Sequence, residues 1–135
     1  MKKILTTLTM LLLTFAPPVI AKEDIDPNKP GYIVLEPIIT NYISYKQNHL
    51  SYVKVEVAIT IGSQTNMAAA KKYIPEIRNA IVFLLNKQGK DDLDGAIERQ
   101  ILSNKGLELV QAIYIEEMGN KWATEFLWGF FAIQN

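Results

Sequence analysis

The clearest pattern in the chain is a strict alternation of apolar and polar residues between positions 50 and 61. The apolar positions are all β-branched, and most positions between them are polar or charged. The apolar series is Val53, Val55, Val57, Ile59 and Ile61, and the opposite series includes Tyr52, Lys54, Glu56 and Thr60. A two-residue period of this kind predicts a strand with one face on a hydrophobic core.

A helical period follows this strand directly. Residues 62–66 supply turn chemistry, and Thr65 or Asn66 is suited to cap the helix that follows. Apolar residues then recur three and four positions apart, which predicts an amphipathic helix over about 66–85. Pro75 leaves two alternatives, a kink in one helix or a short leading helix followed by a second helix that starts at Pro75. The apolar stripe comprises Ile74, Ile77, Ile81, Leu84 and Leu85.

Two shorter apolar runs, 32–35 and 38–43, precede the alternating strand and are rich in strand-forming residues. Pro37 lies between them and cannot donate a hydrogen bond to a neighbouring strand, so this segment is either an edge strand or is bulged at that point. The polar connection at 44–48 makes a hairpin with the strand at 50–61 the simplest arrangement.

The segment from 91 to 118 is also helix-forming, after a polar break at 86–90. Its apolar residues fall into two stripes, one before and one after Ser103 and Gly106. Serine and glycine weaken a helix interior, so we predict two helices with a break near Ser103. Three aspartates at the start, Asp91, Asp92 and Asp94, are suited to a helix N-terminus, and we expect them to cap and to face solvent rather than to bind a metal.

A turn at Gly119 and Asn120 leads into an aromatic segment, 122–134, that predicts a terminal strand. Regular alternation places Phe126, Trp128 and Phe130 on one face of this strand. The opposite face then carries Leu127, Phe131 and Ile133. A strand that is apolar on both faces either completes the core or offers one face to a partner, and Phe126, Trp128 and Phe130 are the candidate interface.

The N-terminus has the features of a secretory signal peptide. Lys2 and Lys3 precede an apolar stretch at 4–15, and Ala21 provides a small residue at the cleavage position. We therefore predict a signal peptide over 1–21. An uncleaved anchor is the alternative, although an apolar stretch extended to Ile20 reaches only about the lower limit for a spanning helix, and Pro17 and Pro18 would break that helix. Residues 22–31 are expected to be a flexible leader, and 32–135 a single domain.

Composition excludes several classes of function. The chain has no cysteine and one histidine, His49, in a predicted loop, so neither a thiolate site nor a catalytic triad can be assembled. No nucleophile elbow, phosphate loop or zinc-protease helix motif is present, which argues against a hydrolase. Without residues 1–21 the chain has 12 basic and 14 acidic residues, a net charge of −2, and lacks the basic excess typical of nucleic-acid binding. We expect a protein without enzymatic activity and without a cofactor.

Several blocks of the sequence together resemble the flagellar basal body-associated protein FliL family. The most specific block runs from Ile74 to Ile81 and includes Pro75, Glu76, Ile77 and Arg78 at a fixed distance after the alternating strand. The resemblance extends over about 32–134. The other matching blocks are Tyr32-Ile33-Val34-Leu35-Glu36-Pro37, the strand from Tyr52 to Ile59, and the ending Phe131-Ala132-Ile133-Gln134.

The resemblance implies an α+β domain similar to the stomatin/SPFH type, with helices on one face of an antiparallel sheet. It also implies a non-enzymatic, periplasmic motor protein that supports stator function and motility by assembling into a homo-oligomeric ring. Its expected partners are stator and basal-body proteins, which would hold it near the inner membrane.

Three features depart from the usual family pattern: a signal-like N-terminus, a longer segment at 89–106, and Gly129 in place of a common threonine. They indicate a divergent or accessory member. The alternative function is a periplasmic small-ligand-binding or chaperone-like module, suggested by the aromatic residues Trp122, Phe126 and Trp128.

Overall fold

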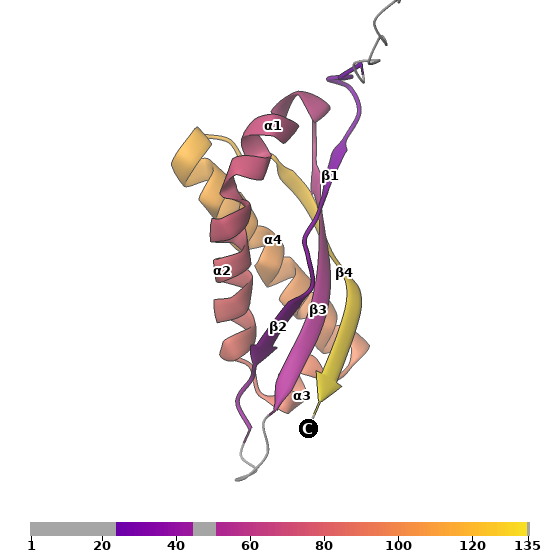
Figure 1. Ribbon diagram of the computed structural model, residues 1–135, viewed down its shortest axis with the longest axis vertical. Helices are drawn as coiled ribbons and strands as arrows, with labels where there is room; N and C mark the ends of the chain where they lie inside the picture. Colours follow the sequence, from indigo (N-terminus) through magenta and orange to yellow (C-terminus); the bar gives the residue numbers. More distant parts are fainter. Residues whose placement is uncertain (1–23, 45–50, 135) are drawn as a thin grey trace, which may run out of the picture.

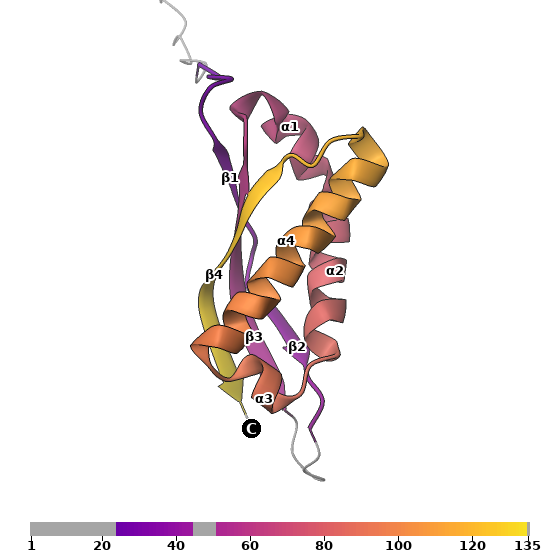
Figure 2. The ribbon, with the colours of Figure 1, turned by 180° about the vertical axis from the view of Figure 1, so that it is seen from behind.

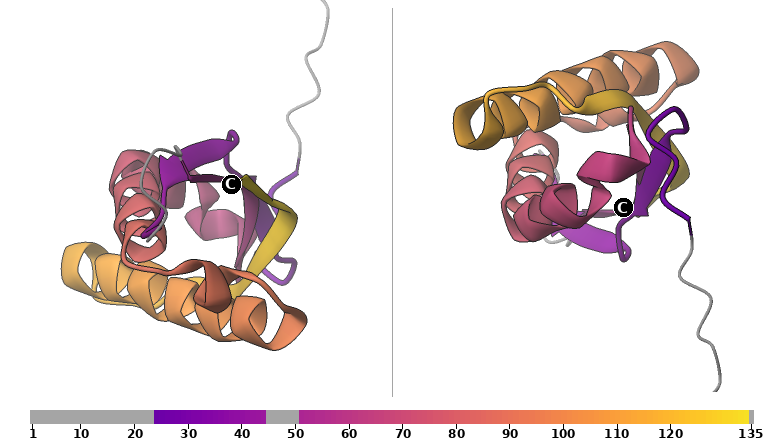
Figure 3. Two further views of the ribbon diagram at one scale, coloured as in Figure 1. Left: turned by 90° about the horizontal axis from the view of Figure 1, so that it is seen from below. Right: turned by 90° about the horizontal axis from the view of Figure 1, so that it is seen from above.

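The computed structural model describes residues 24–44 and 51–134, and it confirms the predicted α+β class. Four strands form one antiparallel sheet (Figure 1). Two long helices, α2 (Ile74–Asn86) and α4 (Ala96–Met118), lie side by side against one face of that sheet (Figure 2). Views from the two ends show both helices on the same side of the strands (Figure 3). The similarity to the stomatin/SPFH type stays a prediction.

The central strand is β3 (Tyr52–Ile61), the alternating segment of the sequence. The last strand, β4 (Ala123–Gln134), pairs with it along one edge. The strands β1 (Gly31–Val34) and β2 (Ile38–Asn41) lie end to end along the other edge. The pairing register shifts by one residue between β1 and β2, so the chain is bulged at Pro37 in an edge position. The segment is therefore both an edge strand and bulged at Pro37, the two possibilities that this proline raised.

The alternation of β3 is confirmed by its burial. The five β-branched residues on one face are no more than 1% exposed, and they pack against the helices. On the other face Lys54 and Glu56 are exposed to solvent. The core between sheet and helices also contains Ile77, Ile81 and Leu85 from α2, each 0% exposed, as the helical stripe predicts.

The region around Pro75 follows the second of the two alternatives. A short helix, α1 (Met67–Ala70), and a 3₁₀ turn (Lys71–Tyr73) precede α2, and Pro75 lies in the first turn of α2. A proline costs little there because the first N–H groups of a helix have no intrahelical partner. The expected cap at Thr65 or Asn66 is wrong, since Ser63 Oγ accepts the hydrogen bond from the Thr65 N–H at 3.3 Å.

The predicted helix break near Ser103 is wrong. The chain forms a short helix, α3 (Lys90–Leu93), turns at Asp94 and Gly95, and then continues through Ser103 and Gly106 without interruption in α4. Gly95 takes a φ of 129°, a backbone conformation that favours glycine, so the break occurs there. The start of α3 is capped as expected, because the Gly89 N–H donates to the Asp92 carboxylate at 3.0 Å.

The segment just before β1 is tied to the turn that follows β3. The Gln64 side chain accepts a hydrogen bond from the Asp26 N–H at 3.0 Å, and its backbone N–H donates to the Lys29 carbonyl at 2.9 Å. Ser63 Oγ donates to the Pro27 carbonyl at 2.9 Å. This part of the predicted leader therefore follows a defined path into the sheet. The predicted cleavage site at Ala21 and the predicted loop residue His49 lie outside the described residues.

Candidate functional site

The aromatic residues of β4 do not share one face, and the alternation predicted for them is wrong. Val57 pairs with Trp128, but Val55 pairs with Phe131, so β4 has one extra residue opposite Glu56. This β-bulge reverses the side on which the following residues lie. Phe126 is 3% exposed and Trp128 is half-buried on the helix side, whereas Phe130 is 47% exposed. Of the three candidate interface residues, Phe130 alone is freely accessible.

Phe126 is enclosed by two small residues of α4. The Phe126 carbonyl accepts a buried hydrogen bond from the Ser103 hydroxyl. Its ring lies over Gly106, where an added Cβ would come within 2.7 Å of Cζ. Ser103 and Gly106 thus stay inside the helix because β4 needs a donor and an open space at those positions. The buried ring is part of the core and cannot act as a contact surface in the folded protein.

Trp128 and Phe131 form a second aromatic cluster with α4. Their rings meet edge to face, with centroids 5.3 Å apart. The Arg99 guanidinium lies 4.6 Å from the centre of the Phe131 ring, and the Trp128 indole N–H donates to the Arg99 carbonyl at 3.0 Å. These contacts fasten the C-terminal half of β4 to the first turns of α4. The Phe131 of the family motif therefore has a structural role.

The other residues of the family motif also stabilise the fold. Ile77 is fully buried, and Glu76 lies in the first turn of α2, where a negative charge is favourable. Arg78 Nη1 donates to the Glu36 carbonyl at 2.7 Å, which secures the bulge between β1 and β2. The motif thus joins the start of α2 to the irregular edge of the sheet.

At the C-terminal end of β4, Gln134 is held from two sides. Its side chain accepts a hydrogen bond from the Tyr52 hydroxyl, and its carbonyl accepts one from the Tyr42 hydroxyl at 3.3 Å. Tyr52 is the direct partner of Gln134 in the ladder between β3 and β4. Gln134 therefore secures the C-terminal end of β4, which lies at the opposite end of the sheet from the start of α2 (Figure 1).

The sheet face turned away from the helices is the principal candidate surface, and we call it the open face. Its centre is a cross-strand row in which Val34 pairs with Ala58 and Ala58 pairs with Leu127. Val34 is 74% exposed and Leu127 is 54% exposed, although both are apolar. Neighbouring rows of the same face carry Tyr32, Ile39, Lys54 and Glu56. Clustered exposed apolar residues of this kind mark contact surfaces.

The sequence does indicate an apolar open face, but the indication lies in β1 and not in the alternating strand β3. Residues 32–35 are apolar at every position, which requires that β1 present apolar side chains on both faces. The structure buries Ile33 and Leu35 and leaves Tyr32 and Val34 exposed.

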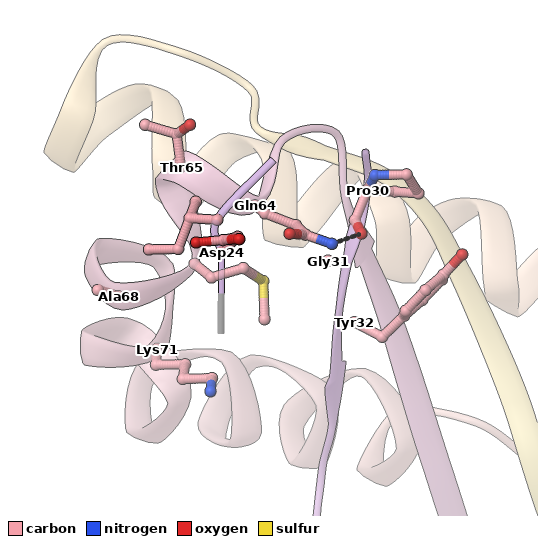
Figure 4. Close-up of a pocket in the computed structure, with 10 residues that line it drawn as sticks. Asp24, Pro30, Gly31, Tyr32, Gln64, Thr65, Ala68 and Lys71 are labelled. Carbon is pink, nitrogen blue, oxygen red and sulfur yellow. Dashed lines mark hydrogen bonds between the residues drawn. The ribbon is translucent and has the colours of Figure 1, made fainter. Parts of the chain in front are cut away.

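An open groove lies between β1 and α1, close to the point where the described chain begins (Figure 4). Its volume is about 770 Å³, and Tyr32, Met67 and Gln64 are among the residues that line it. Asp24 and Lys71 give it one charge of each sign. Its lining mixes apolar residues with polar side chains that include Gln64 and Thr65, a composition suited to contact with a ligand or a peptide.

Acid–base and metal chemistry find no support in the described part of the chain. No group of three histidine, cysteine, aspartate or glutamate residues could hold a metal ion within 24–44 and 51–134. Burial raises the pKa of Tyr114 to about 12, and its hydroxyl donates to the Ala70 carbonyl at 3.1 Å. A phenol with such a high pKa stays protonated at neutral pH and serves the packing of α4 on α1.

Among the described residues, no helix is long and apolar enough to span a bilayer. Comparison with curated proteins yields no match. The sequence model of the family described as flagellar basal body-associated protein FliL matches residues 32–128, which include β1 to β3, the Pro75 block, α4 and the first half of β4. Since this match covers most of the chain and the whole core of the fold, the protein belongs to the FliL family of flagellar basal body-associated proteins.

Proposed function

We propose that the protein supports the stator units of the flagellar motor, and thereby motility, through protein–protein contacts and without catalysis. The observation that carries the proposal is the family match over residues 32–128. The open face supports it, because Val34 and Leu127 would be costly to keep in water unless another protein covers them at the basal body.

The proposal places the protein in the periplasm. Export depends on the predicted signal peptide at 1–21, and the protein would then be kept at the inner membrane by stator and basal-body partners. Self-association into a ring belongs to the same proposal, because a protein that surrounds a stator must present more than one contact surface. Phe130 on β4 is accessible for such contacts.

The test is a cross-linked capture of the tagged protein from motile cells, followed by mass spectrometry. We expect stator and basal-body proteins to dominate the captured set, and we expect deletion of the gene to reduce swimming. A Val34→Asp/Leu127→Asp variant that is produced at normal levels should capture less of the same set. Unchanged motility after deletion, together with capture of none of these proteins, would refute the proposal.

The groove beside α1 favours one second candidate, a periplasmic module that binds a small ligand or an unfolded peptide. Its volume of about 770 Å³ is within the range of small-molecule sites, and Tyr32 and Met67 provide apolar contacts. The fluorescence of Trp122 is a poor reporter of ligand binding in the groove, because this residue packs on Tyr114, with ring centroids 5.5 Å apart. A Tyr32→Trp variant would place a fluorophore in the groove, and unchanged emission across a broad ligand screen would dismiss this candidate.

A further inference from the structure

We infer that the outward side of α4 is the contact surface of a two-fold dimer, in which a second copy of this chain packs its own α4 antiparallel against the first. We call this side the outer face of α4. The inference goes beyond the proposed function, because a closed two-fold contact joins only two copies and leaves ring assembly to other surfaces. The exposed positions that define the outer face are Ile97, Ile101, Lys105, Glu108, Ala112 and Ile115.

The outer face is more apolar than solvent exposure explains. The side of α4 turned to the sheet buries Val110 and Tyr114, as expected of a core-facing stripe. The opposite side also carries large apolar residues, since Ile97 is 73%, Ile101 49% and Ile115 46% exposed. A surface helix normally has one apolar stripe and one polar face, whereas a helix that is apolar all round is normally covered on both sides. Figure 2 shows α4 as the outermost element on this side of the molecule.

The apolar residues of the outer face lie along one line of the helix. Ile97 and Ile101 are four positions apart, and Ala112 and Ile115 are three apart, so each pair lies on one side of α4. Ile97 and Ile115 are 18 positions apart, which is about five full turns of 3.6 residues. They therefore point in the same direction at opposite ends of the helix. Spacings of three and four along one line are typical of a helix that packs against another helix.

The charges between these apolar ends select an antiparallel second copy as the occupant. Lys105 and Glu108 are both exposed, and neither forms an ion pair with a described residue. A two-fold axis that crosses α4 between Gly106 and Leu107 places Lys105 of each copy level with Glu108 of the other. A parallel pair in register would instead place like charges side by side, which is unfavourable.

The same axis brings the apolar residues together. It places Ile101 of each copy level with Ala112 of the other, because both are the same number of residues from the axis. Ile97 of one copy comes within one residue of the level of Ile115 of the other, about 1.5 Å along the helix. The charge pairing and the apolar burial therefore require the same register, and each contact is made twice.

The size of the outer face predicts a weak dimer. The 23 residues of α4 give a helix about 34 Å long, and a contact strip about 12 Å wide then covers roughly 400 Å² per copy. Standard interfaces bury about 800 Å² per partner. The dimer should therefore depend on concentration and respond strongly to single substitutions.

The first experiment is sedimentation velocity of the purified full-length protein over about 10 µM to 1 mM, the range in which a weak interface dissociates. We expect the average mass to rise toward that of a dimer. Ile101→Asp and Ile97→Asp should each stay monomeric, and urea unfolding checks that both are folded. Val34→Asp is the matched control, because Val34 is 74% exposed on the open face, and it should associate like the parent protein.

The second experiment tests the register by disulfide formation. The chain has no cysteine, so introduced thiols report only on their own positions. A mixture of Ile101→Cys and Ala112→Cys proteins should form the mixed disulfide at least tenfold faster than Ile101→Cys alone. In the antiparallel pair the two copies of position 101 are 11 residues apart in level, about 16 Å, which is too far for a disulfide.

Charge reversal tests the two-fold axis independently. Lys105→Glu or Glu108→Lys alone should weaken dimerisation about tenfold, because each creates two repulsive contacts per dimer. The double variant K105E/E108K should return to within about threefold of the parent protein. A double variant that dimerises no better than the single ones would overturn the proposed axis.

The remaining outcomes separate this inference from the proposed function. A parent protein that stays monomeric to 1 mM refutes the dimer, and capture of basal-body proteins by that monomer would leave the proposed function standing. Loss of association in Val34→Asp with retention in Ile101→Asp would move the contact to the open face and refute the inference. A disulfide of Ile101→Cys alone that forms as fast as the mixed one also refutes it. Dimerisation through α4 without basal-body capture would support the inference and remove the proposed function.

Discussion

Gly106 lies beneath the ring of Phe126, and one added methyl group there tests the account of how β4 is held. A Cβ at this position would lie 2.7–2.9 Å from the Cζ, Cε1 and Cε2 atoms of the ring. Ordinary carbon contacts lie at about 3.5–4.0 Å, so the ring must move by almost 1 Å. It has little freedom to do so, because Ser103 bonds to the Phe126 carbonyl and Trp128 packs edge to face on the ring at 4.9 Å.

Two opposing effects set the size of the change. Replacing glycine by alanine within a helix gains about 1 kcal/mol from helix propensity. Overpacking a tight core costs about 1–3 kcal/mol. We therefore expect Gly106→Ala to lower the free energy of unfolding by about 1 kcal/mol, although the same substitution in a free helix would raise it.

The decisive comparison is made in a Phe126→Leu background. Leucine has no atoms equivalent to Cε1, Cε2 and Cζ, so the clash disappears and Gly106→Ala should stabilise by up to about 1 kcal/mol. The double-mutant cycle should give a coupling energy of about 1–3 kcal/mol. Urea unfolding measures all four proteins, and Lys105→Ala, an exposed neighbour in α4, should change stability by less than about 0.5 kcal/mol. Equal stabilisation by Gly106→Ala in both backgrounds would refute the predicted clash with the Phe126 ring.

The remaining predictions address β4, the motif arginine and the buried phenol. Phe126→Ala should cost about 3–5 kcal/mol in urea unfolding, whereas Phe130→Ala should stay within about 0.5 kcal/mol, and equal effects would contradict the bulge. Arg78→Ala should cost about 1 kcal/mol through the lost bond to the Glu36 carbonyl, with Arg78→Lys partly rescuing it. Burial raises the Tyr114 pKa from 10.0 to about 12, so the folded state binds its proton more tightly than the unfolded state, and stability should fall from pH 10 to 12. Tyr114→Phe should flatten that decline in pH-dependent unfolding, and a decline of unchanged slope would contradict the assignment.

The sequence predicts well those parts of the fold whose pattern of apolar and polar residues repeats over a few neighbouring positions. Successive residues of β3 alternate because its two faces meet different surroundings, and that difference appears in adjacent positions. Pro75 narrows the helix to two alternatives, a kink or a new first turn, because its missing N–H is tolerated in a first turn, and the structure has the first turn. In both places the chemical reason lies within a few residues of the pattern.

The helix break failed as a prediction because its evidence lies elsewhere in the chain. Ser103 and Gly106 are weak helix formers, and local propensity alone favours a break between them. Their small size is required by Phe126, which is 20 or more residues further along the chain and reaches them through the sheet. Packing against Phe126 therefore outweighs a helix-propensity cost of about 1 kcal/mol. The cost can be seen in the local sequence, but the packing that offsets it cannot.

The bulge at Gly129 and Phe130 has the largest consequence for function, because one extra residue changes which side chains of β4 face the helices. Before it, the helix side of β4 carries Phe126 and Trp128, and after it the same side carries Phe131. Loss of partner binding in a Phe126 or Trp128 variant would consequently report damage to the core. Leu127 and Phe130 are the positions on β4 where a substitution can separate contact from folding, because both side chains are about half exposed. A binding defect confined to these two positions, with unchanged unfolding, would identify the surface that the protein uses.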